Sequence, residues 1–442
     1  MARKRVSRRT YLATVLGAST VGLSGCGSDD GGTATTGDER AGTGTRTDRP
    51  TDTATPTDAP TATRTPTDTP TETPTDTPTA TETATPTPDA SSFASWPAFM
   101  GNNEHWGHHP DASGPHDGAS VDWKRSFDQD QINATAVLAD GTLYVGAGGA
   151  GDSSGSFHAL DPITGETKWS KDTAAPVTSA AAVSGGLVYV GTSHGMLYAL
   201  QPADGSKFWE WDLTSTEAFT APVVAERDVY IGSTGSRVYN FDALDSTQKW
   251  NQDTYGAITA SPVFADEMIY APSADHSLYA ITPGGDVEWK KKLDGSVNGV
   301  SYRDRRLYVA TEGGTLSQIN TRGSVDWERP LGAGIAATPA VTGDRVFVGT
   351  RDSTLYAVDA SDGVEHWRFT DPTDGVTAPP AVADGTVYVG SRDGTVYAVD
   401  TENGDEEWSF ETGNNIDQAA PIVAGGRVYI GSQDGTFYAL SE

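Results

Sequence analysis

The chain has 442 residues and combines 60 Asp and Glu with 30 Lys and Arg, which gives a formal charge of −30. This acidity argues against a nucleic-acid partner, because phosphate binding depends on Lys and Arg side chains and on counterion release. The single cysteine, Cys26, excludes an intramolecular disulfide and a cysteine-cluster metal site. With 36% hydrophobic residues, the chain can build a core only if its polar residues are concentrated elsewhere.

The first 25 residues contain five basic residues, no acidic residue and a short apolar run. Arg8 and Arg9 stand in a Ser-Arg-Arg-Thr-Tyr-Leu string that resembles a twin-arginine export signal, and the Leu-Ser-Gly-Cys that ends at Cys26 resembles a lipobox. We therefore predict a twin-arginine lipoprotein signal at 1–25, lipidation of Cys26, and anchoring to the outer face of the cytoplasmic membrane. The alternative is a cleaved signal with an incidental cysteine.

Residues 26–90 consist mainly of Thr, Pro, Asp, Gly and Ala, with almost no large apolar side chains. Such a segment cannot bury enough apolar surface to offset its conformational entropy, so we predict a disordered linker. Its Thr/Pro tracts are typical of a stalk that can carry O-linked sugars.

From residue 91 onward, tryptophan recurs every 38 to 46 residues. The series is Trp123, Trp169, Trp209, Trp250, Trp289, Trp327, Trp367 and Trp408. An aliphatic-aromatic pair that runs into Gly or Ala precedes each later tryptophan, and further strand-like segments lie between them. A period near 40 residues with four short strands per unit indicates a β-propeller.

The clearest unit predicts strands at 377–383, 386–391, 394–400 and 406–410, joined by Asp-Gly or Asn-Gly turns. The first strand of five units contains a proline at an equivalent position, and proline is confined to edge strands because it cannot donate to a ladder. The innermost strand of a propeller blade is such an edge. These prolines are Pro222, Pro262, Pro339, Pro380 and Pro421.

The series of aliphatic-aromatic pairs and the series of tryptophans are out of phase at the two ends of the repeat region. Trp123 precedes any first strand, and the last unit stops before its fourth strand. We therefore predict that residues 121–127 supply the outer strand of the last blade and close the ring. The predicted fold of 91–442 is an all-β, eight-bladed propeller of four-stranded blades, monomeric in solution.

The Asp400-x-x-x-Gly404-x-x-x-Trp408 pattern recurs in other units and resembles the tryptophan-docking motif of pyrroloquinoline-quinone (PQQ) repeat propellers. The segment from Trp96 to Asn102 also resembles the lead-in of that family. The resemblance implies that each tryptophan packs between neighbouring blades. The unit at about 297–330 departs most, with Ser317 where the family has Tyr.

The family contains quinoprotein dehydrogenases and non-catalytic lipoproteins, including an outer-membrane assembly-factor lipoprotein, so the fold does not choose between them. The resemblance implies that the enzymes need calcium, an Asp base and usually a vicinal disulfide. This chain has one cysteine and keeps short, regular repeats. We therefore predict a non-catalytic binding module without a cofactor, whose partner is an unidentified protein or envelope ligand. The alternatives are a PQQ- and calcium-dependent dehydrogenase of alcohols or sugars, and a solute-binding envelope module.

Alignment of the repeats predicts the residues at the channel mouth, where a ligand would bind. None of these residues is charged, and the one adjacent carboxylate is that of Asp417. The set therefore offers too few oxygen ligands for a hard cation such as calcium. The predicted residues are Asn133, Thr178, Phe219, Thr259, Val297, Ala336, Thr377 and Gln418. Asn133 also begins the one N-glycosylation sequon.

Two other motifs resemble ligand-binding motifs, but we predict no binding site at either of them. The Gly-x-Gly-x-x-Gly at 146–151 precedes no helix, so we predict a flexible hairpin rather than a phosphate loop. His105, His108, His109 and His116 could bind zinc or copper, but their irregular spacing favours a solvated loop. We predict no metal site.

Residues 91–442 contain 48 acidic and 21 basic residues. Such charge repels itself at ordinary salt and is screened at molar salt, where the Debye length is about 3 Å. With the export signal and Thr-rich stalk, this composition is typical of exported proteins of halophilic archaea. The alternative is that the carboxylates bind calcium or a basic partner.

Overall fold

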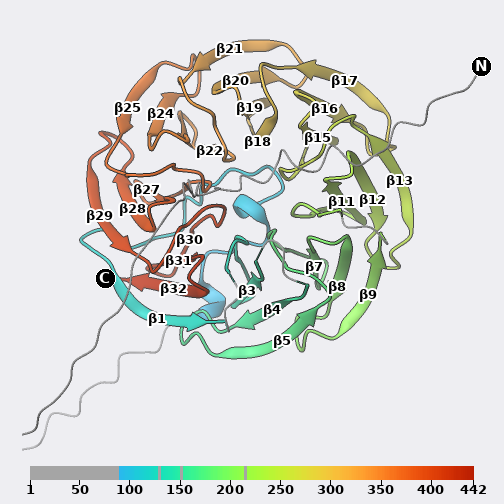
Figure 1. The fold of residues 1–442 in the computed structure, drawn as a ribbon, viewed down its shortest axis with the longest axis horizontal. Coiled ribbons are helices and arrows are strands. Elements are labelled where there is room, and N and C mark those ends of the chain that lie inside the picture. The colour runs from blue at the N-terminus through green and yellow to red at the C-terminus, as the bar shows by residue number, and fades with distance from the viewer. Residues whose placement is uncertain (1–88, 128–130, 150–152, 214–216) are drawn as a thin grey trace, which may run out of the picture. The chain divides into compact units, whose positions relative to one another are not determined.

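The computed structural model describes residues 89–127, 131–149, 153–213 and 217–442 (Figure 1). The predicted export signal with Arg8 and Arg9, the lipidation residue Cys26 and nearly all of the stalk lie outside these residues. Within the described ranges, no helix is long and apolar enough to span a membrane.

Eight antiparallel four-stranded sheets form a ring, which confirms the predicted eight-bladed propeller (Figure 1). Blades 1 to 3 are β2 (Val137–Ala139), β3 (Thr142–Ala147), β4 (Gly155–Leu160), β5 (Thr167–Thr173); β6 (Ala182–Ser184), β7 (Leu187–Gly191), β8 (Met196–Leu200), β9 (Lys207–Asp212); and β10 (Val223–Ala225), β11 (Asp228–Ser233), β12 (Arg237–Asp242), β13 (Gln248–Asp253).

Blades 4 to 6 are β14 (Val263–Ala265), β15 (Met268–Ser273), β16 (Ser277–Ile281), β17 (Val287–Lys292); β18 (Val297–Arg303), β19 (Arg306–Thr311), β20 (Thr315–Asn320), β21 (Val325–Pro330); and β22 (Ala340–Val341), β23 (Arg345–Gly349), β24 (Leu355–Asp359), β25 (Glu365–Phe369). Blades 7 and 8 are β26 (Ala381–Ala383), β27 (Thr386–Gly390), β28 (Thr395–Asp400), β29 (Glu406–Glu411); and β30 (Ile422–Ala424), β31 (Arg427–Gly431), β32 (Thr436–Ser441) with β1 (Ser120–Ser126). Two short 3-10 helices, η1 (Ala90–Ser92) and η2 (Phe99–Gly101), precede the propeller strands.

The ring closes between the two ends of the propeller, as predicted. β1 pairs antiparallel with β32, and Trp123 lies opposite Ala439 in that ladder. Closure in this way gives blade 8 its fourth strand, so the blade is not left with β32 as an unpaired outer edge.

The innermost strands are shorter than predicted. In blade 7 the first strand was expected over 377–383 but covers only Ala381–Ala383, directly after Pro380. The other four prolines of this series likewise stand immediately before an innermost strand. A proline nitrogen cannot donate to β27, so ladder pairing begins after it.

The tryptophan series performs the docking that the family resemblance implied. Each indole N–H donates to a backbone carbonyl that lies just before the outer strand of the neighbouring blade, at N–O distances of 2.7 to 3.2 Å. The pairs are Trp123 with Pro162, Trp169 with Pro202, Trp209 with Ala243, Trp250 with Pro283, Trp289 with Thr321, Trp327 with Ala360, Trp367 with Thr401 and Trp408 with Pro115. All eight tryptophans therefore serve packing between blades.

Candidate functional site

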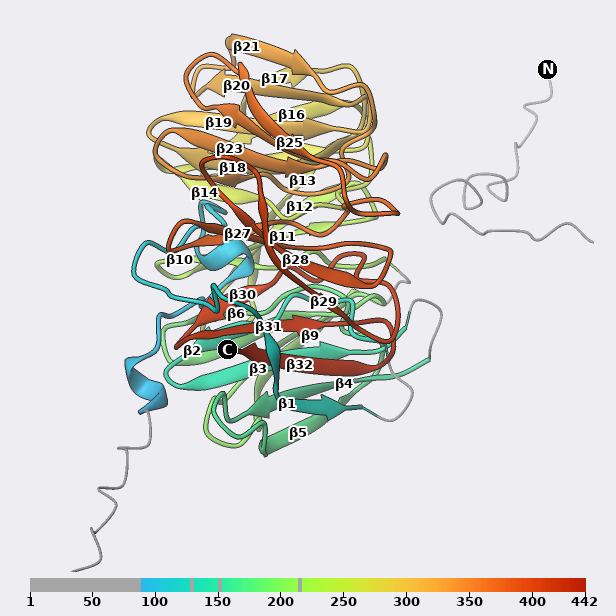
Figure 2. The same ribbon diagram turned by 90° about the vertical axis from the view of Figure 1, so that its left-hand side faces the viewer.

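The lead-in segment, residues 96–113, runs around the centre of the ring, and we call it the strap. Figure 1 places η2 in the middle of the ring, and Figure 2 shows it at the end where β10 and β14 lie. Trp96 pairs with Leu138 of blade 1 through two backbone hydrogen bonds of 2.7 and 2.9 Å. Further along, Gly107 accepts from Val382 of blade 7 at 2.7 Å.

Equivalent residues of all eight innermost strands bond to the strap. In six blades their N–H groups donate to strap carbonyls, and in blades 3 and 8 their carbonyls accept from strap side chains, at 2.7 to 3.0 Å throughout. The residues are Leu138, Val183, Val224, Phe264, Tyr302, Val341, Val382 and Val423. The strap thus satisfies polar groups on the inner edge of every blade.

This arrangement corrects the prediction of a solvated histidine loop. His105 is 1% exposed, its Nδ1 lies 3.2 Å from the Val300 carbonyl, and burial lowers its pKa to about 4. His108 is half-buried 3.4 Å from Arg303, and burial lowers its pKa to about 4 as well. The loop is buried because the strap pairs with the blades.

The other two histidines face different parts of the ring. His109 packs 5.8 Å from the ring of Trp96, and His116 Nε2 lies 3.2 Å from Asp384. Within the described ranges, no three His, Cys, Asp or Glu side chains form a group that could hold a metal ion.

The predicted channel-mouth set is misaligned at three positions. Phe219 and Val297 are 3% and 1% exposed and belong to the cores between blades, because each stands where the other blades carry an aliphatic residue such as Ile258. The residues that align with Thr377 in those two blades are Thr220, which is 6% exposed, and Asn298, which is partly exposed. In blade 8 that position falls on Asp417 rather than Gln418, since Ile416 packs against Gly390.

The aligned set contains one carboxylate, and it is already engaged. Thr377 Oγ1 donates to Asp417 Oδ1 at 2.8 Å, and Arg392 lies 3.5 Å from the same oxygen. Asn298 donates to Glu312 at 2.8 Å. Calcium requires six or more oxygen ligands, several of them carboxylates. These residues do not fit a calcium–PQQ site.

The remaining predicted mouth residues differ in accessibility. Thr259 is exposed, and Thr178 and Ala336 are partly exposed. Asn133 is 9% exposed, its Nδ2 donates to Gln131 and its Oδ1 accepts from Gln433. N-glycosylation of Asn133 stays a prediction, and this burial argues against it.

The first glycine of the glycine-rich motif, Gly146, allows close packing between two blades. Gly146 lies in β3, and a Cβ there would stand 2.4 Å from Val177 of the next blade. Residues 150–152 of the predicted hairpin lie outside the described ranges.

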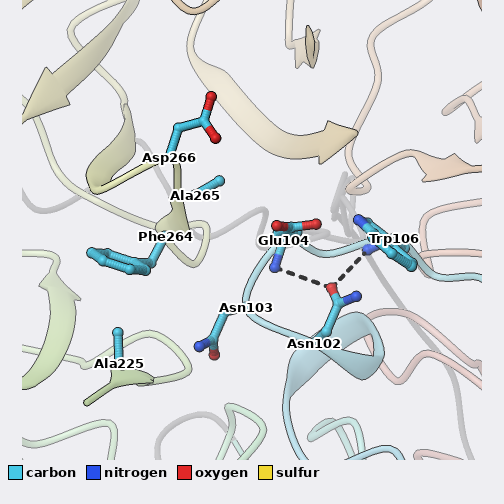
Figure 3. Close-up of a pocket in the computed structure, with 8 residues that line it drawn as sticks. All are labelled: Asn102, Asn103, Glu104, Trp106, Ala225, Phe264, Ala265 and Asp266. Atoms are coloured by element: carbon cyan, nitrogen blue, oxygen red, sulfur yellow. Dashed lines mark hydrogen bonds between the residues drawn. The ribbon is translucent and has the colours of Figure 1, made fainter. Parts of the chain in front are cut away.

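A pocket of about 490 Å³ opens on the strap side, between the strap and the inner turns of blades 3 and 4 (Figure 3). Its lining residues are Asn102, Asn103, Glu104, Trp106, Ala225, Phe264, Ala265 and Asp266. A second space of about 220 Å³ continues along the strap and shares Asn102 and Asn103 with it.

The strap residues of this pocket are fixed by hydrogen bonds. Asn102 Oδ1 accepts from the backbone N–H groups of Glu104 and Trp106 at 3.0 and 3.3 Å, as Figure 3 shows. Burial raises the pKa of the Glu104 carboxyl, and the indole of Trp106 opposes that shift. The carboxylate of Asp266 raises it further. The pocket therefore holds one partly desolvated carboxyl, that of Glu104, beside the exposed Asp266.

This pocket was not predicted from the sequence. Its residues come from three separate segments, and the lead-in motif that begins at Trp96 was the one available signal. That motif indicated family resemblance but gave no course for the strap through the ring.

Known proteins resemble this chain in sequence and in fold. The family model described as "Outer membrane protein assembly factor BamB" matches residues 112–220, 153–301, 274–378 and 371–442. The outer membrane protein assembly factor BamB of Yersinia pestis is 27% identical over 251 residues, which cover 52% of this chain and 63% of that protein. The match thus spans less than two thirds of this relative's length.

Solved structures share the fold. BamB from Moraxella catarrhalis superposes with a TM-score of 0.61 at 18% identity, over 73% of this chain and 98% of that one. A quinohemoprotein alcohol dehydrogenase from Comamonas testosteroni gives a TM-score of 0.66 at 15% identity, over 78% and 80%. Likeness at these identities extends to the fold alone.

Proposed function

This chain belongs to the propeller family whose model is described as outer membrane protein assembly factor BamB, and we propose that it is an exported, lipid-anchored, non-catalytic scaffold that binds another envelope protein. Its relatives are named as assembly factors, which supports a role in holding proteins together. The sequence patterns at Arg8, Arg9 and Cys26 support export and a lipid anchor on the outer face of the cytoplasmic membrane.

The observation that carries the proposal is the joining of all blades by one strap and eight docked tryptophans. Such a ring is a rigid body whose short turns and outer strands form an extended surface. Rigid surfaces suit protein binding, because little conformational entropy is lost when they associate.

A crosslinking experiment in intact cells tests the scaffold role. The tagged full chain should crosslink to the same envelope proteins in repeated preparations. Cys26→Ser should release the chain from the membrane while its circular dichroism stays unchanged. Membrane retention of the Cys26→Ser chain would refute the lipid anchor, and the absence of reproducible partners would refute the scaffold.

Activity measurements test the alternatives. Purified protein is supplied with PQQ, Ca²⁺, an alcohol or sugar and an artificial electron acceptor. We expect no turnover above the protein-free rate, and robust turnover would replace the scaffold with a dehydrogenase. Stabilisation by one small solute in a thermal-shift screen, without crosslinked partners, would favour a solute-binding module.

A further inference from the structure

We propose that the two strap-side pockets form one groove, which binds an extended peptide of a partner protein along the inner edge of blade 3. The two spaces, of about 490 and 220 Å³, share Asn102 and Asn103 and are lined by residues of β6, β10 and β14 (Figure 3). The larger one lies within the range of ligand sites. The origin of the peptide rests on the proposed scaffold role, whereas the groove itself is tested separately.

The strap backbone pairs with the blades on both sides of blade 3 but not with blade 3. The Pro97 carbonyl accepts from Val183 of blade 2 at 2.7 Å, and the Asn103 carbonyl accepts from Phe264 of blade 4 at 3.0 Å. Between these two strap residues, η2 occupies the middle of the ring (Figure 1). Within the described residues, one side chain bridges the strap to this edge, since Asn103 Nδ2 donates to the Val224 carbonyl at 2.8 Å.

The backbone N–H of Val224 has no acceptor at this edge. Val224 stands opposite Val229 in the β10–β11 ladder, as Val183 stands opposite Val188 in blade 2. Because the Val183 N–H donates to the strap, this register directs the N–H of either residue away from its ladder and toward the strap. No hydrogen bond from the Val224 N–H is formed within the described residues. An unpaired strand edge is a template for pairing with another chain.

Blade 8 shows that the missing backbone pairing is not sufficient by itself. The Val423 carbonyl accepts from the Trp96 indole, and its N–H likewise pairs with no strap carbonyl among the described residues. That edge is sealed, because Val423 is 0% and Trp96 is 2% exposed. Val224, in contrast, lines the space of about 220 Å³. Blade 3 therefore combines an unpaired edge with room for a second chain.

Two side-chain amides extend this edge with a further acceptor and a further donor. Asn103 uses its Nδ2 on Val224, and Asn102 uses its Oδ1 on strap N–H groups. Asn103 Oδ1 and Asn102 Nδ2 form no hydrogen bond in the described part of the chain, and both residues line the groove. A peptide carbonyl would accept from Val224, and a peptide N–H would donate to Asn103 Oδ1. Main-chain bonds of this kind supply the affinity in strand addition.

The walls of the groove favour small apolar side chains on the peptide. Four alanines line it together with Phe264, whose ring is stacked on Tyr230 at 5.5 Å between ring centres. Because side chains of an extended peptide alternate between two sides, every second residue would face these walls. The alanines are Ala98, Ala182, Ala225 and Ala265.

Charge decides between the possible sources of the peptide. Asp266 at the rim is 3.8 Å from Arg305, whereas Glu226 and Glu267, which stand in the adjoining turns, are exposed and form no ion pair in the described ranges. Residues 26–88 of this chain contain 11 acidic and 4 basic residues. Like charge at the rim disfavours this segment and a second copy of the acidic chain. The groove therefore suits a neutral or basic segment of another protein.

The test is a fluorescence-anisotropy titration of the purified full chain with labelled hexapeptides at one fixed salt concentration. The probes are capped peptides that alternate Ala or Val with Thr and contain one Lys. A matched series carries an N-methyl group on a central backbone amide, which removes one peptide N–H. We expect saturable binding of at least one probe and about a tenfold loss on N-methylation, because a main-chain hydrogen bond is lost.

Three variants locate the binding. Ala225→Trp fills the groove and should weaken binding about tenfold or more, whereas Gln248→Trp, on the exposed outer strand of the same blade and outside the groove, should change it less than about twofold. Val224→Pro removes the edge N–H without removing a ladder bond, and edge strands tolerate proline. It should weaken binding about tenfold. Thermal unfolding checks that each variant is folded.

The outcomes separate the groove from the scaffold role. Absence of saturable binding by any probe, or equal losses in Ala225→Trp and Gln248→Trp, would overturn the groove even if crosslinked partners are found. Binding of the probes without any crosslinked partner would support the groove and refute the scaffold. Tighter binding of a peptide of residues 66–88 than of every probe would overturn the assignment to a partner protein.

Discussion

Gly205→Ala should destabilise the propeller more than Gly185→Ala, although both replace a blade 2 glycine that has a positive φ. The φ values are 68° for Gly205 and 59° for Gly185. A Cβ on Gly205 would lie 2.5 Å from the docked ring of Trp169, whereas nothing lies within 4 Å of a Cβ on Gly185. The pair therefore separates the backbone cost from the loss of tryptophan docking.

The magnitudes follow from these contacts. A left-handed conformation costs an L-residue about 1–2 kcal/mol, and both variants bear this cost. Forcing a methyl group into a packed contact costs about 1–3 kcal/mol more, and only Gly205→Ala bears it. We expect Gly185→Ala to lower the free energy of unfolding by about 1–2 kcal/mol and Gly205→Ala by about 2–5 kcal/mol.

Urea unfolding, followed by circular dichroism and tryptophan fluorescence, measures both values. A change in midpoint at constant slope reports stability rather than compactness. Equal destabilisation by the two substitutions would refute the reasoning, because it would mean that the turn carries no packing against Trp169.

Three further predictions concern the strap and the charge. Trp96→Phe removes the indole N–H that donates to the Val423 carbonyl at 2.8 Å. It should lower the free energy of unfolding, measured in urea, by about 1–3 kcal/mol. The pKa values of His105 and His108 lie near 4 when folded and near 6.5 when unfolded, so the unfolded chain binds more protons between these values. Stability should therefore fall as the pH is lowered from 6.5 towards 4, by up to about 1.4 kcal/mol per pH unit for the buried His105 and by less for the partly exposed His108. A urea midpoint that is equal at pH 7 and pH 5 would contradict this. Raising NaCl from about 0.15 to about 2 M should raise the melting temperature, because salt screens the repulsion of the acidic surface, and an unchanged melting temperature would contradict this.

The sequence predicted the ring well because the repeated residues act locally and in the same way. Trp169 and Trp408 differ in their docking partners, yet both positions follow from the 40-residue period. Ring closure was predictable because β1 and the last blade each lacked a counterpart. The ends of the innermost strands were less predictable. The sequence pattern places Pro380 within a strand, but β26 begins only at the next residue.

The pocket and the strap could not be predicted in this way, because they depend on contacts between distant residues that do not repeat. Glu104 contacts Tyr302, and Trp96 contacts Val423, without any periodic pattern. The errors in the predicted channel-mouth residues come from a one-residue misalignment of the repeats. Phe219 and Val297 were aligned one residue away from their true equivalents, and a shift of one residue exchanges a mostly polar position for an apolar core position.

The hydrogen bond between Trp96 and Val423 joins residues 327 positions apart and has a consequence for folding. Blades 1 to 7 are each built from strands that are neighbours in the chain, so each can form early from local contacts. The strap, in contrast, precedes every blade in the chain and cannot complete its bonds until the last blade exists. We therefore expect blades 1 to 7 to form from local contacts, and the strap and blade 8, which join both ends of the propeller, to be completed late.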